Sequence, residues 1–345
     1  MTDTMMRAAV IGVGAMGRNH ARVYKELLDV ELAAVADLDP VRTSEAARLH
    51  DARAYADYHA MLKEIHPDVV TVAVPTHAHY QVVIDALEAG CHVLVEKPIA
   101  ATLEEGQRII ERAAELGKVL AVGHIERYNP AIIELKRQLD DGKLGQIFQI
   151  HARRLGPFPQ RVHDVGVIVD LVPHDLDIMR YLTGAQVQRM YAETQQKIHE
   201  THEDWFSGLI RFENGVVGVL NTSWLTPTKV REITVTGQRG MFLANLLTQD
   251  LYFYENADAG GSEWNHLSLL RGVGEGQMVR LQLRRREPLR TELKTFVDAV
   301  REGQGAVTCG AREAIVCGED ALAVLELAQA LVRSGREHQI ISMEA

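Results

Sequence analysis

The chain has 345 residues, of which 46% are hydrophobic and 24% are charged, and its formal net charge is −10. This length and composition predict a large buried core divided between two domains. The acidic balance argues against nucleic acid or a membrane surface as the main partner, and no apolar run approaches the roughly 18 residues that span a bilayer.

The first six residues lack the basic and apolar regions of a secretory signal, and the residues after them read as a strand. We therefore expect a cytoplasmic protein with reduced, mostly buried thiols. The three cysteines, Cys91, Cys309 and Cys317, have neither the spacing of a metal site nor that of a redox motif. We expect no metal ion.

A glycine-rich loop follows the first predicted strand (residues 7–11) and precedes a predicted helix (15–28) and a second strand (30–37). In this context a G-x-G-x-x-G motif binds a dinucleotide, with the pyrophosphate at the helix N-terminus. The first glycine permits the tight turn, the second lets the pyrophosphate approach the backbone, and the third lets the helix pack closely on the strand. The cofactor-binding candidates in this loop are Gly12, Gly14, Ala15, Met16 and Gly17.

Asp37 ends the second predicted strand, 20 residues after Gly17. A carboxylate at this place accepts hydrogen bonds from both hydroxyls of the adenosine ribose and repels a 2′-phosphate. Leu38 follows, so that neither Arg nor Ser is present to bind such a phosphate. The sequence therefore predicts NAD rather than NADP.

Three further strands are predicted over residues 68–75, 92–96 and 119–122, with helices between them. The alternation predicts an α/β Rossmann domain, a doubly wound parallel sheet, over residues 1–128. The carboxyl ends of its strands meet at the edge where such folds bind their ligands, and Lys97 is delivered to that edge. The further cofactor-contacting candidates there are Pro75, Thr76, His79, Glu96 and Lys97.

Beyond residue 128 strand-like patterns dominate, over residues 146–154, 188–195, 205–212, 216–224, 229–236, 251–254 and 280–286. Helices are predicted over residues 131–139, 292–302 and 313–334. This pattern predicts an α+β domain over residues 129–345, with an open, mostly antiparallel sheet that helices cover on one face. The other face of this sheet needs cover too, which predicts that it packs against another subunit. The C-terminal helix is expected to pack back on the first domain.

One helix of the second domain carries Asp170 and His174, four residues apart and therefore on one helical face. Pro173 is tolerated best in a first turn, so the helix should begin near Val169. Alone, the pair also fits a helix-capping arrangement. Together with Lys97 it favours a catalytic site.

These residues resemble the glucose-fructose oxidoreductase, inositol dehydrogenase and MocA (Gfo/Idh/MocA) family of NAD(P)-dependent dehydrogenases, through nearly the whole chain. The resemblance rests on the glycine loop, the loop from Thr76 to His79, the motif Glu96-Lys97-Pro98, and the Asp-x-x-x-His run from Asp170 to His174. It implies a Rossmann domain followed by a mostly antiparallel sheet that forms the interface of a homodimer or homotetramer. It also implies catalytic roles for Lys97 and His174, with Asp170 as a supporting polar residue.

Residues 123–131, 152–161 and 164–171 are similar to those of the UDP-N-acetylglucosamine 3-dehydrogenases, which oxidise the sugar 3-hydroxyl so that an aminotransferase can install an amino group. This narrower resemblance implies a UDP-sugar substrate and a functional link to an aminotransferase. The substrate-binding candidates are Arg127, Tyr128, Asn129, Arg154, Arg161, Asp170 and His174.

Arginines around the predicted cleft favour a phosphorylated substrate independently, because guanidinium groups bind diphosphates bidentately. They are Arg127, Arg153, Arg154 and Arg161. Arg153 and Arg154 occupy alternate faces of one predicted strand, so we expect one of them to be structural.

The mechanistic hypothesis assigns His174 as the general base, because its unperturbed pKa of ~6.5 suits neutral pH. Lys97 would hydrogen-bond the same substrate oxygen and stabilise the developing alkoxide. A desolvated lysine also acts as a base, so the two roles are exchangeable. Asp170 would orient His174 or bind a substrate hydroxyl.

Two other functions stay open at this point. One is a dehydrogenase of the same fold that acts on a free polyol or sugar such as inositol and does not need the arginines. The other is a non-catalytic NAD-binding sensor or regulator, against which the complete set of Lys97, Asp170 and His174 counts.

Overall fold

The computed structural model describes residues 5–159, 165–256, 275–303 and 315–343. The chain forms two compact units: Met1–Tyr128 with Glu287–Glu326, and Asn129–Arg286 with Leu327–Ala345. The division after Tyr128 coincides with the domain boundary that the sequence predicts. Residues 287–326, however, belong to the first unit, whereas the sequence analysis placed them in the second.

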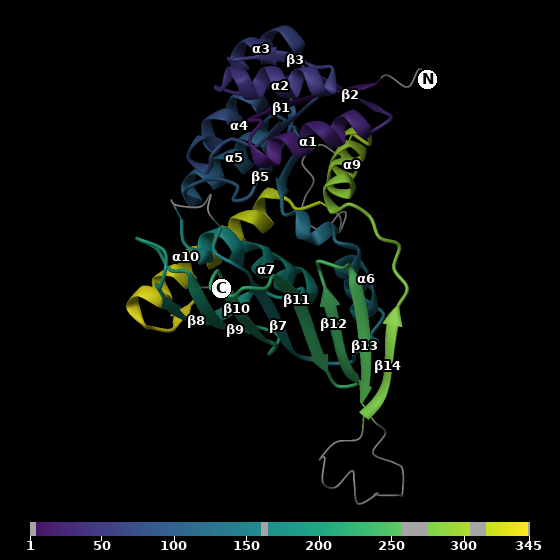
Figure 1. Cartoon of the computed structure of the whole chain (residues 1–345), viewed down its shortest axis with the longest axis vertical. Coiled ribbons are helices and arrows are strands. Elements are labelled where there is room, and N and C mark those ends of the chain that lie inside the picture. The colour runs from purple at the N-terminus through teal and green to yellow at the C-terminus, as the bar shows by residue number, and fades with distance from the viewer. Residues whose placement is uncertain (1–4, 160–164, 257–274, 304–314, 344–345) are drawn as a thin grey trace, which may run out of the picture. The chain divides into compact units, whose positions relative to one another are not determined.

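A six-stranded sheet forms the centre of the first unit, with helices on both of its faces (Figure 1). All its strands pair in parallel, in the order β3-β2-β1-β4-β5-β6. They are β1 (Met6–Ile11), β2 (Val30–Ala36), β3 (Arg53–Tyr55), β4 (Val69–Val72), β5 (His92–Glu96) and β6 (Leu120–Gly123). This confirms the predicted Rossmann fold. The short strand β3 was not predicted, because at a largely exposed edge it carries no apolar run.

The helices of this unit bury apolar side chains on each side of the sheet. From the N-terminal part of the chain they are α1 (Ala15–Glu26), α2 (Pro40–His50), α3 (Tyr58–Ile65), α4 (His79–Glu88) and α5 (Leu103–Glu115), with the 3₁₀ turns η1 (Thr76–Ala78) and η2 (Ile125–Tyr128). Two helices come from much later in the chain, α9 (Pro288–Arg301) and the first part of α10 (Gly318–Glu337). Leu293 and Phe296 of α9 join one core, and Ala321 and Leu325 of α10 join the other, which explains why residues 287–326 belong here.

A nine-stranded sheet forms the second unit, in the order β14-β13-β12-β11-β7-β10-β9-β8-β15. Among the described pairs, β7 and β10 run in parallel and the others are antiparallel, so the sheet is mixed but mostly antiparallel, as predicted. The strands are β7 (Ile147–Leu155), β8 (Val187–Gln195), β9 (Trp205–Phe212), β10 (Val217–Ser223), β11 (Val230–Gly237), β12 (Gly240–Asn245), β13 (Asp250–Asn256), β14 (Glu275–Leu281) and β15 (Ile341–Ser342).

Two strands of this sheet differ from the prediction. Strand β12 was missed, although it alternates buried and half-buried residues and pairs with β11 through a tight turn after Gly237. Strand β14 ends at Leu281, so the arginine-rich residues 282–286 predicted as strand lie outside it. Pairing with β13, and not the alternation of Arg and Leu, decides where β14 ends.

Helices α6 (Pro130–Asp140) and α7 (Val167–Thr183) cover one face of this sheet (Figure 1). On the opposite face, the strand register aligns a single row of side chains across eight strands. In order across the sheet they are Tyr191, Leu209, Val219, His151, Thr234, Leu243, Tyr252 and Arg280. Leu209, near the middle of β9, is 53% exposed in the single chain. We call this row the open-face row.

Helix α7 begins two residues earlier than predicted, at Val167, so that Pro173 lies in its second turn. The first turn is held from outside the helix. The Val167 N–H donates to the Glu203 carbonyl at 2.9 Å, and the Ile168 N–H donates to Glu203 Oε1 at 3.2 Å. These bonds satisfy N–H groups that a helix start leaves unpaired, and they explain why the helix extends beyond the limit inferred from Pro173.

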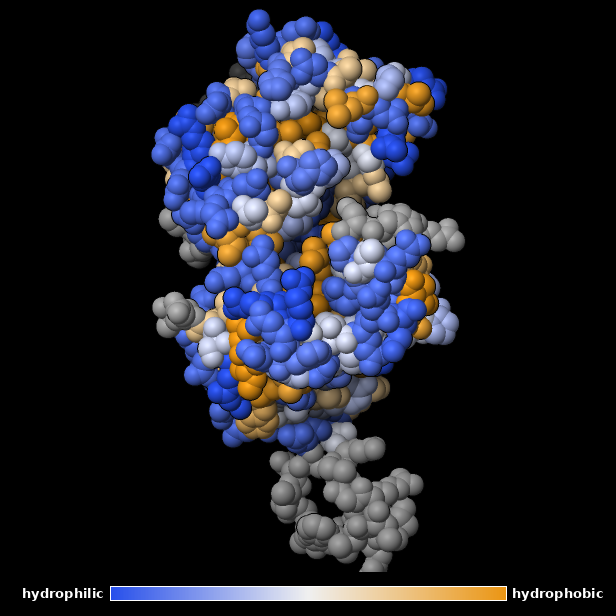
Figure 2. Space-filling model, turned by 90° about the vertical axis from the view of Figure 1, so that its left-hand side faces the viewer, coloured by the Kyte–Doolittle hydropathy of each residue, from blue (hydrophilic) through white to orange (hydrophobic). Residues whose placement is uncertain are grey.

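Within the described residues, no helix combines the length and the apolar character needed to cross a bilayer. Figure 2 shows one face of the molecule, on which hydrophilic side chains predominate and hydrophobic ones form separate patches.

Cys91 is a free, buried thiol, as expected. Cys317 is disulfide-bonded, which corrects the expectation that it is reduced, since sequence spacing does not reveal which thiols approach in space. Cys309 lies outside the described residues.

Candidate active site

The glycine loop has the geometry that a bound pyrophosphate requires. Gly12 has a φ of +89°, in the left-handed region that favours glycine. A Cβ on Gly17 would lie 1.8 Å from the Gly12 carbonyl oxygen, so α1 reaches the loop only without a side chain there. A Cβ on Gly14 would meet no protein atom within 4 Å, which leaves open space beside the backbone N–H groups at the start of α1. The residues present therefore fit a dinucleotide phosphate.

Asp37 ties this loop to the end of β2. Its Oδ2 accepts the Val13 N–H at 2.8 Å, and its Oδ1 accepts the Asp39 N–H at 2.9 Å. Each carboxylate oxygen has a second lone pair, so both remain able to accept a ribose hydroxyl. Asp37 therefore anchors the glycine loop, a contact that was not predicted, and its role in ribose binding stays a prediction.

The other predicted cofactor residues of this unit lie at the carboxyl ends of β4 and β5. Pro75 and Thr76 follow β4, with Pro75 exposed and Thr76 half-buried. Glu96 ends β5, and the half-buried Lys97 comes directly after it. Ala15 and Met16 open α1 on the same side, as the parallel strands require.

His79 is placed differently from the expectation. Its ring is 1% exposed, and both of its nitrogens lie against backbone carbonyls, Nδ1 at 2.8 Å from Pro98 O and Nε2 at 2.9 Å from Val74 O. A second buried imidazole, that of His20 on α1, was missed by the sequence analysis. Its Nε2 lies 2.6 Å from Glu96 Oε1. The only available signal was its position three residues after Gly17, on the buried side of α1.

In the second unit, Asp170 and His174 lie one turn apart near the start of α7, and both are half-buried. The loop before β9 holds this helix start. Asp204 in that loop is fully buried, and its carboxylate accepts the N–H groups of Lys197, Ile198 and His199. Asp204 and its neighbour Glu203 thus order the segment that caps α7, a role that no local pattern indicates.

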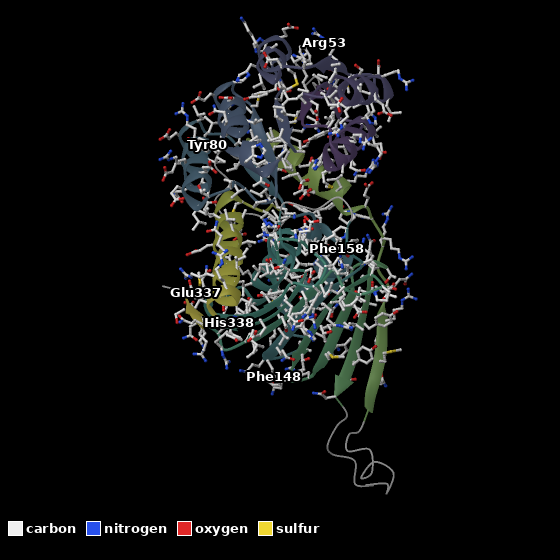
Figure 3. The ribbon with its side chains drawn as sticks, turned by 60° about the vertical axis from the view of Figure 1, so that its left-hand side comes forward. Arg53, Tyr80, Phe148, Phe158, Glu337 and His338 are labelled. Atoms are coloured by element: carbon white, nitrogen blue, oxygen red, sulfur yellow. The ribbon has the colours of Figure 1, made fainter. Side chains whose placement is uncertain are left out.

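An aromatic cluster lies beyond the carboxyl ends of β7 and β10. Figure 3 shows Phe158 past this end of β7 and Phe148 at its other end. The Phe158 ring is 5.7 Å from Trp224 and 5.8 Å from His199, measured between centroids. The backbone N–H of Trp224 donates to the Asp204 carbonyl, and this bond joins the cluster to the loop that caps α7.

The predicted arginine cluster is largely engaged with carboxylates. Arg154 is buried and bonds Asp175 of α7 bidentately, through Nε and Nη2 at 2.8–3.0 Å. Arg127 is buried and donates to Asp320 Oδ2 at 3.0 Å. The more exposed Arg153 donates to Glu232 Oε2 at 3.0 Å. Each therefore has a structural partner, and Arg161 lies outside the described residues.

Two other substrate candidates are also buried. Tyr128 is 4% exposed and Asn129 is 1% exposed. The Asn129 side chain caps α6 by accepting the Ala131 N–H at 3.1 Å and donates to the Leu246 carbonyl at 3.0 Å. Both ends of its side-chain amide therefore bond to the backbone, and Asn129 serves as the N-cap before Pro130 at the start of the helix.

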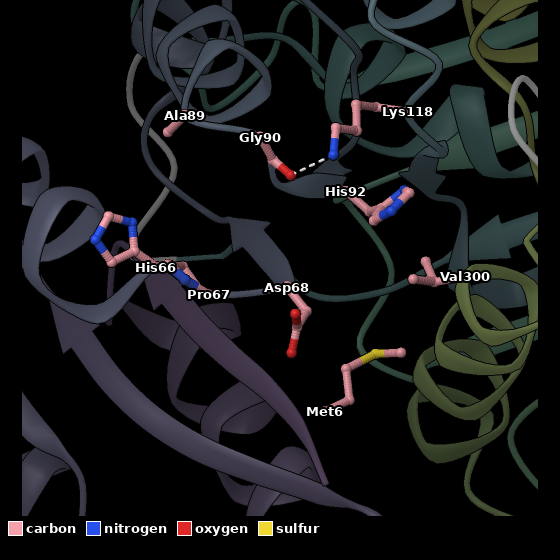
Figure 4. Close-up of a pocket in the computed structure, with 9 residues that line it drawn as sticks. All are labelled: Met6, His66, Pro67, Asp68, Ala89, Gly90, His92, Lys118 and Val300. Carbon is pink, nitrogen blue, oxygen red and sulfur yellow. Dashed lines mark hydrogen bonds between the residues drawn. The ribbon is translucent and has the colours of Figure 1, made fainter. Parts of the chain in front are cut away.

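A cavity of about 310 Å³ opens at the amino-terminal edge of the parallel sheet (Figure 4). Lys118 there donates to the Gly90 carbonyl at 2.5 Å. Burial, together with the Lys118 charge, lowers the pKa of His92 to about 4. Doubly wound sheets bind ligands at the carboxyl edge, so this cavity is separate from the candidate active site.

Two family models match the chain, one for each part. The model of the oxidoreductase family with an NAD-binding Rossmann fold matches residues 6–124, and that of the Gfo/Idh/MocA C-terminal domain matches residues 132–243. The UDP-N-acetylglucosamine 3-dehydrogenase of Acidithiobacillus ferrooxidans is 32% identical over 86% of this chain and 88% of its own. A structure of that organism's UDP-N-acetylglucosamine 3-dehydrogenase superposes with a TM-score of 0.82 at 30% identity, covering 97% of this chain and 99% of its own.

Other relatives have different substrates in their names. The myo-inositol 2-dehydrogenase of Thermotoga maritima is 27% identical over 98% of this chain and 99% of its own. The D-glucoside 3-dehydrogenase of Escherichia coli is 35% identical over 65% of this chain and 72% of its own. The relatives thus share an oxidoreductase chemistry on hydroxyl groups but not one substrate.

The fold and the glycine loop define an NAD-binding dehydrogenase that acts on a hydroxyl group, which confirms the predicted cofactor and class of enzyme. The chain belongs to the Gfo/Idh/MocA family. The dehydrogenase relatives favour an enzyme over the non-catalytic sensor.

Alanine substitutions at Gly14 and Gly17 should separate cofactor approach from folding. We expect Gly17→Ala to destabilise the protein by about 1–3 kcal/mol, because its methyl group meets the Gly12 carbonyl. Gly14→Ala should cost less than about 1 kcal/mol of stability yet weaken NAD⁺ binding, because the methyl group fills the space beside the helix N-terminus. Thermal unfolding and fluorescence titration with NAD⁺ measure both effects. An unchanged affinity of Gly14→Ala for NAD⁺ would contradict the assignment of this loop as the pyrophosphate-binding site.

Proposed function

We propose that this enzyme oxidises the 3-hydroxyl of a UDP-N-acetylated hexose, either UDP-N-acetylglucosamine or its uronate, to the 3-keto sugar. The observation that carries the proposal is the 32% identity to the UDP-N-acetylglucosamine 3-dehydrogenase over 86% of this chain. A 3-keto product needs an aminotransferase to become a 3-amino sugar, so we also propose that functional link.

The proposed mechanism assigns the proton to this chain's own residues. An imidazole nitrogen of His174 accepts the proton of the 3-hydroxyl, and the Lys97 ammonium donates a hydrogen bond to the same oxygen as negative charge develops. Asp170, one turn before His174, orients the imidazole or accepts a substrate hydroxyl. NAD⁺, when bound, supplies the acceptor for the hydride. The proton roles of Lys97 and His174 are exchangeable.

A second candidate is the oxidation of a free polyol such as inositol. It is favoured by the myo-inositol 2-dehydrogenase relative, which matches 98% of this chain, and by the carboxylate partners of Arg127, Arg153 and Arg154. A free polyol carries no diphosphate, so its binding does not require these guanidinium groups.

The cytoplasmic location stays a prediction.

The substrate is tested by following NADH absorbance with purified protein, NAD⁺ and each UDP-sugar, with a coupled aminotransferase to remove the ketone. We expect turnover with a UDP-sugar and little with free N-acetylglucosamine, because the UDP group contributes binding energy. myo-Inositol is the competing substrate. Turnover of inositol with silence on both UDP-sugars would replace the first proposal by the second.

Lys97→Met should reduce kcat by at least about 10²–10³-fold, because it removes the donor proposed to stabilise the alkoxide. NAD⁺ binding should persist, since the glycine loop and Asp37 are unchanged. Lys118→Met is the matched control, because Lys118 lies at the opposite edge of the sheet. Strong residual turnover in Lys97→Met would remove Lys97 from the mechanism.

We also propose that the open-face row forms a homodimer or homotetramer interface, because it exposes Leu209 among other apolar side chains. Leu209→Lys should shift the protein to monomers in sedimentation velocity. Leu49→Lys, at an exposed leucine on α2, should leave the assembly intact. A wild-type protein that sediments as a monomer would contradict this proposal.

A further inference from the structure

Two buried histidines contact the residues on either side of Lys97. His20, on α1, is 0% exposed, and its Nε2 lies 2.6 Å from Oε1 of Glu96, the residue before Lys97. His79, the first residue of α4, is 1% exposed, and its Nδ1 lies 2.8 Å from the carbonyl oxygen of Pro98, the residue after Lys97. The two imidazoles come from different helices and meet the same three-residue segment.

The hydrogen bond between His20 and Glu96 involves an ionised, closely packed carboxylate. Burial alone would raise the pKa of Glu96, but the His20 hydrogen bond and the charges of His20 and Lys97 outweigh it and hold that pKa below its usual value. The carboxylate is therefore ionised at neutral pH, which strengthens the bond. A Cβ on Gly123 of the neighbouring strand would lie 3.0 Å from Glu96 Oε2, so the carboxylate packs into the space that a side chain at Gly123 would need.

His79 can donate to either of two carbonyls, because its Nε2 also lies 2.9 Å from the carbonyl oxygen of Val74, in the loop after β4. Burial lowers the pKa of His79, while the Pro98 and Val74 carbonyls and the Glu96 charge oppose that shift. The neutral imidazole has one N–H and donates to one carbonyl at a time. Donation from Nδ1 holds the segment that follows Lys97, whereas donation from Nε2 holds the loop after β4.

We propose that His20 and His79 are positioning residues that place Lys97, His20 by donating from Nε2 to Glu96 and His79 by donating from Nδ1 to Pro98. The inference rests on the proposed role of Lys97. It assigns His79 an indirect role in place of the cofactor contact expected from the sequence. A misplacement of about 1 Å in a reacting group is enough to cost about 10²-fold in rate, so two anchors beside one ammonium matter for turnover.

Asparagine and glutamine separate the two ring nitrogens, because the Asn amide nitrogen lies near the Nδ1 position and the Gln amide nitrogen near the Nε2 position. His79→Asn keeps the donor toward Pro98, and His79→Gln keeps only the one toward Val74. At the other site His20→Gln keeps the donor toward Glu96, and His20→Asn loses it. Each site therefore contains its own matched control.

We expect kcat in His79→Asn and His20→Gln to stay within about 5-fold of wild type, and kcat in His79→Gln and His20→Asn to fall by about 10²-fold. The KM for NAD⁺ should change little in all four variants, because Asp37 and the glycine loop are intact. Melting temperatures measured for all four show whether a loss of rate merely follows a loss of stability. If the two members of each pair lose the same activity, the histidines only fill space and the proposal is wrong.

Hydrogen exchange at the Lys97 and Ile99 amides tests the same proposal without a substrate. Exchange should be faster in His79→Gln than in His79→Asn, and faster in His20→Asn than in His20→Gln, at equal overall stability. Should one variant fail to fold, the pair at the other site decides. An active Lys97→Met would remove Lys97 from the proposed mechanism but would not change the exchange result, whereas equal exchange within both pairs would overturn the positioning role alone.

Discussion

The parallel alignment of the strands in the first unit is the constraint on which its chemistry depends. Because β1, β2, β4 and β5 all run in one direction, the loops that follow them leave from the same edge. This alignment collects Gly12, Asp37, Pro75 and Lys97, which are far apart in the sequence. The hydrogen bond from the Val13 N–H to Asp37 then ties the glycine loop to the carboxylate that is expected to bind the ribose.

The second unit uses a buried ion pair for a comparable purpose. Arg154 of β7 forms a bidentate ion pair with Asp175 of α7, and Asp175 is the residue after His174. Two desolvated charges contribute little net stability, but removing one partner leaves the other buried without compensation. The pair therefore fixes how α7 lies on the sheet, and with it the place of His174. Arg154, which the sequence predicts to bind substrate, thus also orients the helix that carries the candidate base.

The ion pairs of three arginines weaken the case for a phosphorylated substrate that the sequence suggested. Positive charge near a cleft favours a diphosphate only where it is not already balanced, and Arg127, Arg153 and Arg154 all have carboxylate partners. A nucleotide-sugar substrate is thus favoured by the similarity of most of this chain to a UDP-N-acetylglucosamine 3-dehydrogenase. Relatives named for inositol and for glucosides also match most of this chain, and a shared fold does not by itself choose the alcohol that is oxidised.

Local pattern by itself determined much of this protein. The glycine spacing, the apolar strands, Asp37 at a strand end and the one-turn spacing of Asp170 and His174 each depend on residues close together in the chain. Such patterns have the period of the element that they form, so the Rossmann fold, NAD and the mostly antiparallel second sheet were predictable. The partners of Arg127, Arg154 and Asn129, the contacts of His20 and His79, and the place of α9 and the first part of α10 in the first unit are visible only in the folded chain. The tertiary structure also set the early start of α7, which depends on Glu203 from a distant loop. Each of these depends on which side chain from elsewhere in the chain arrives within hydrogen-bonding or packing distance, and no local period encodes that approach.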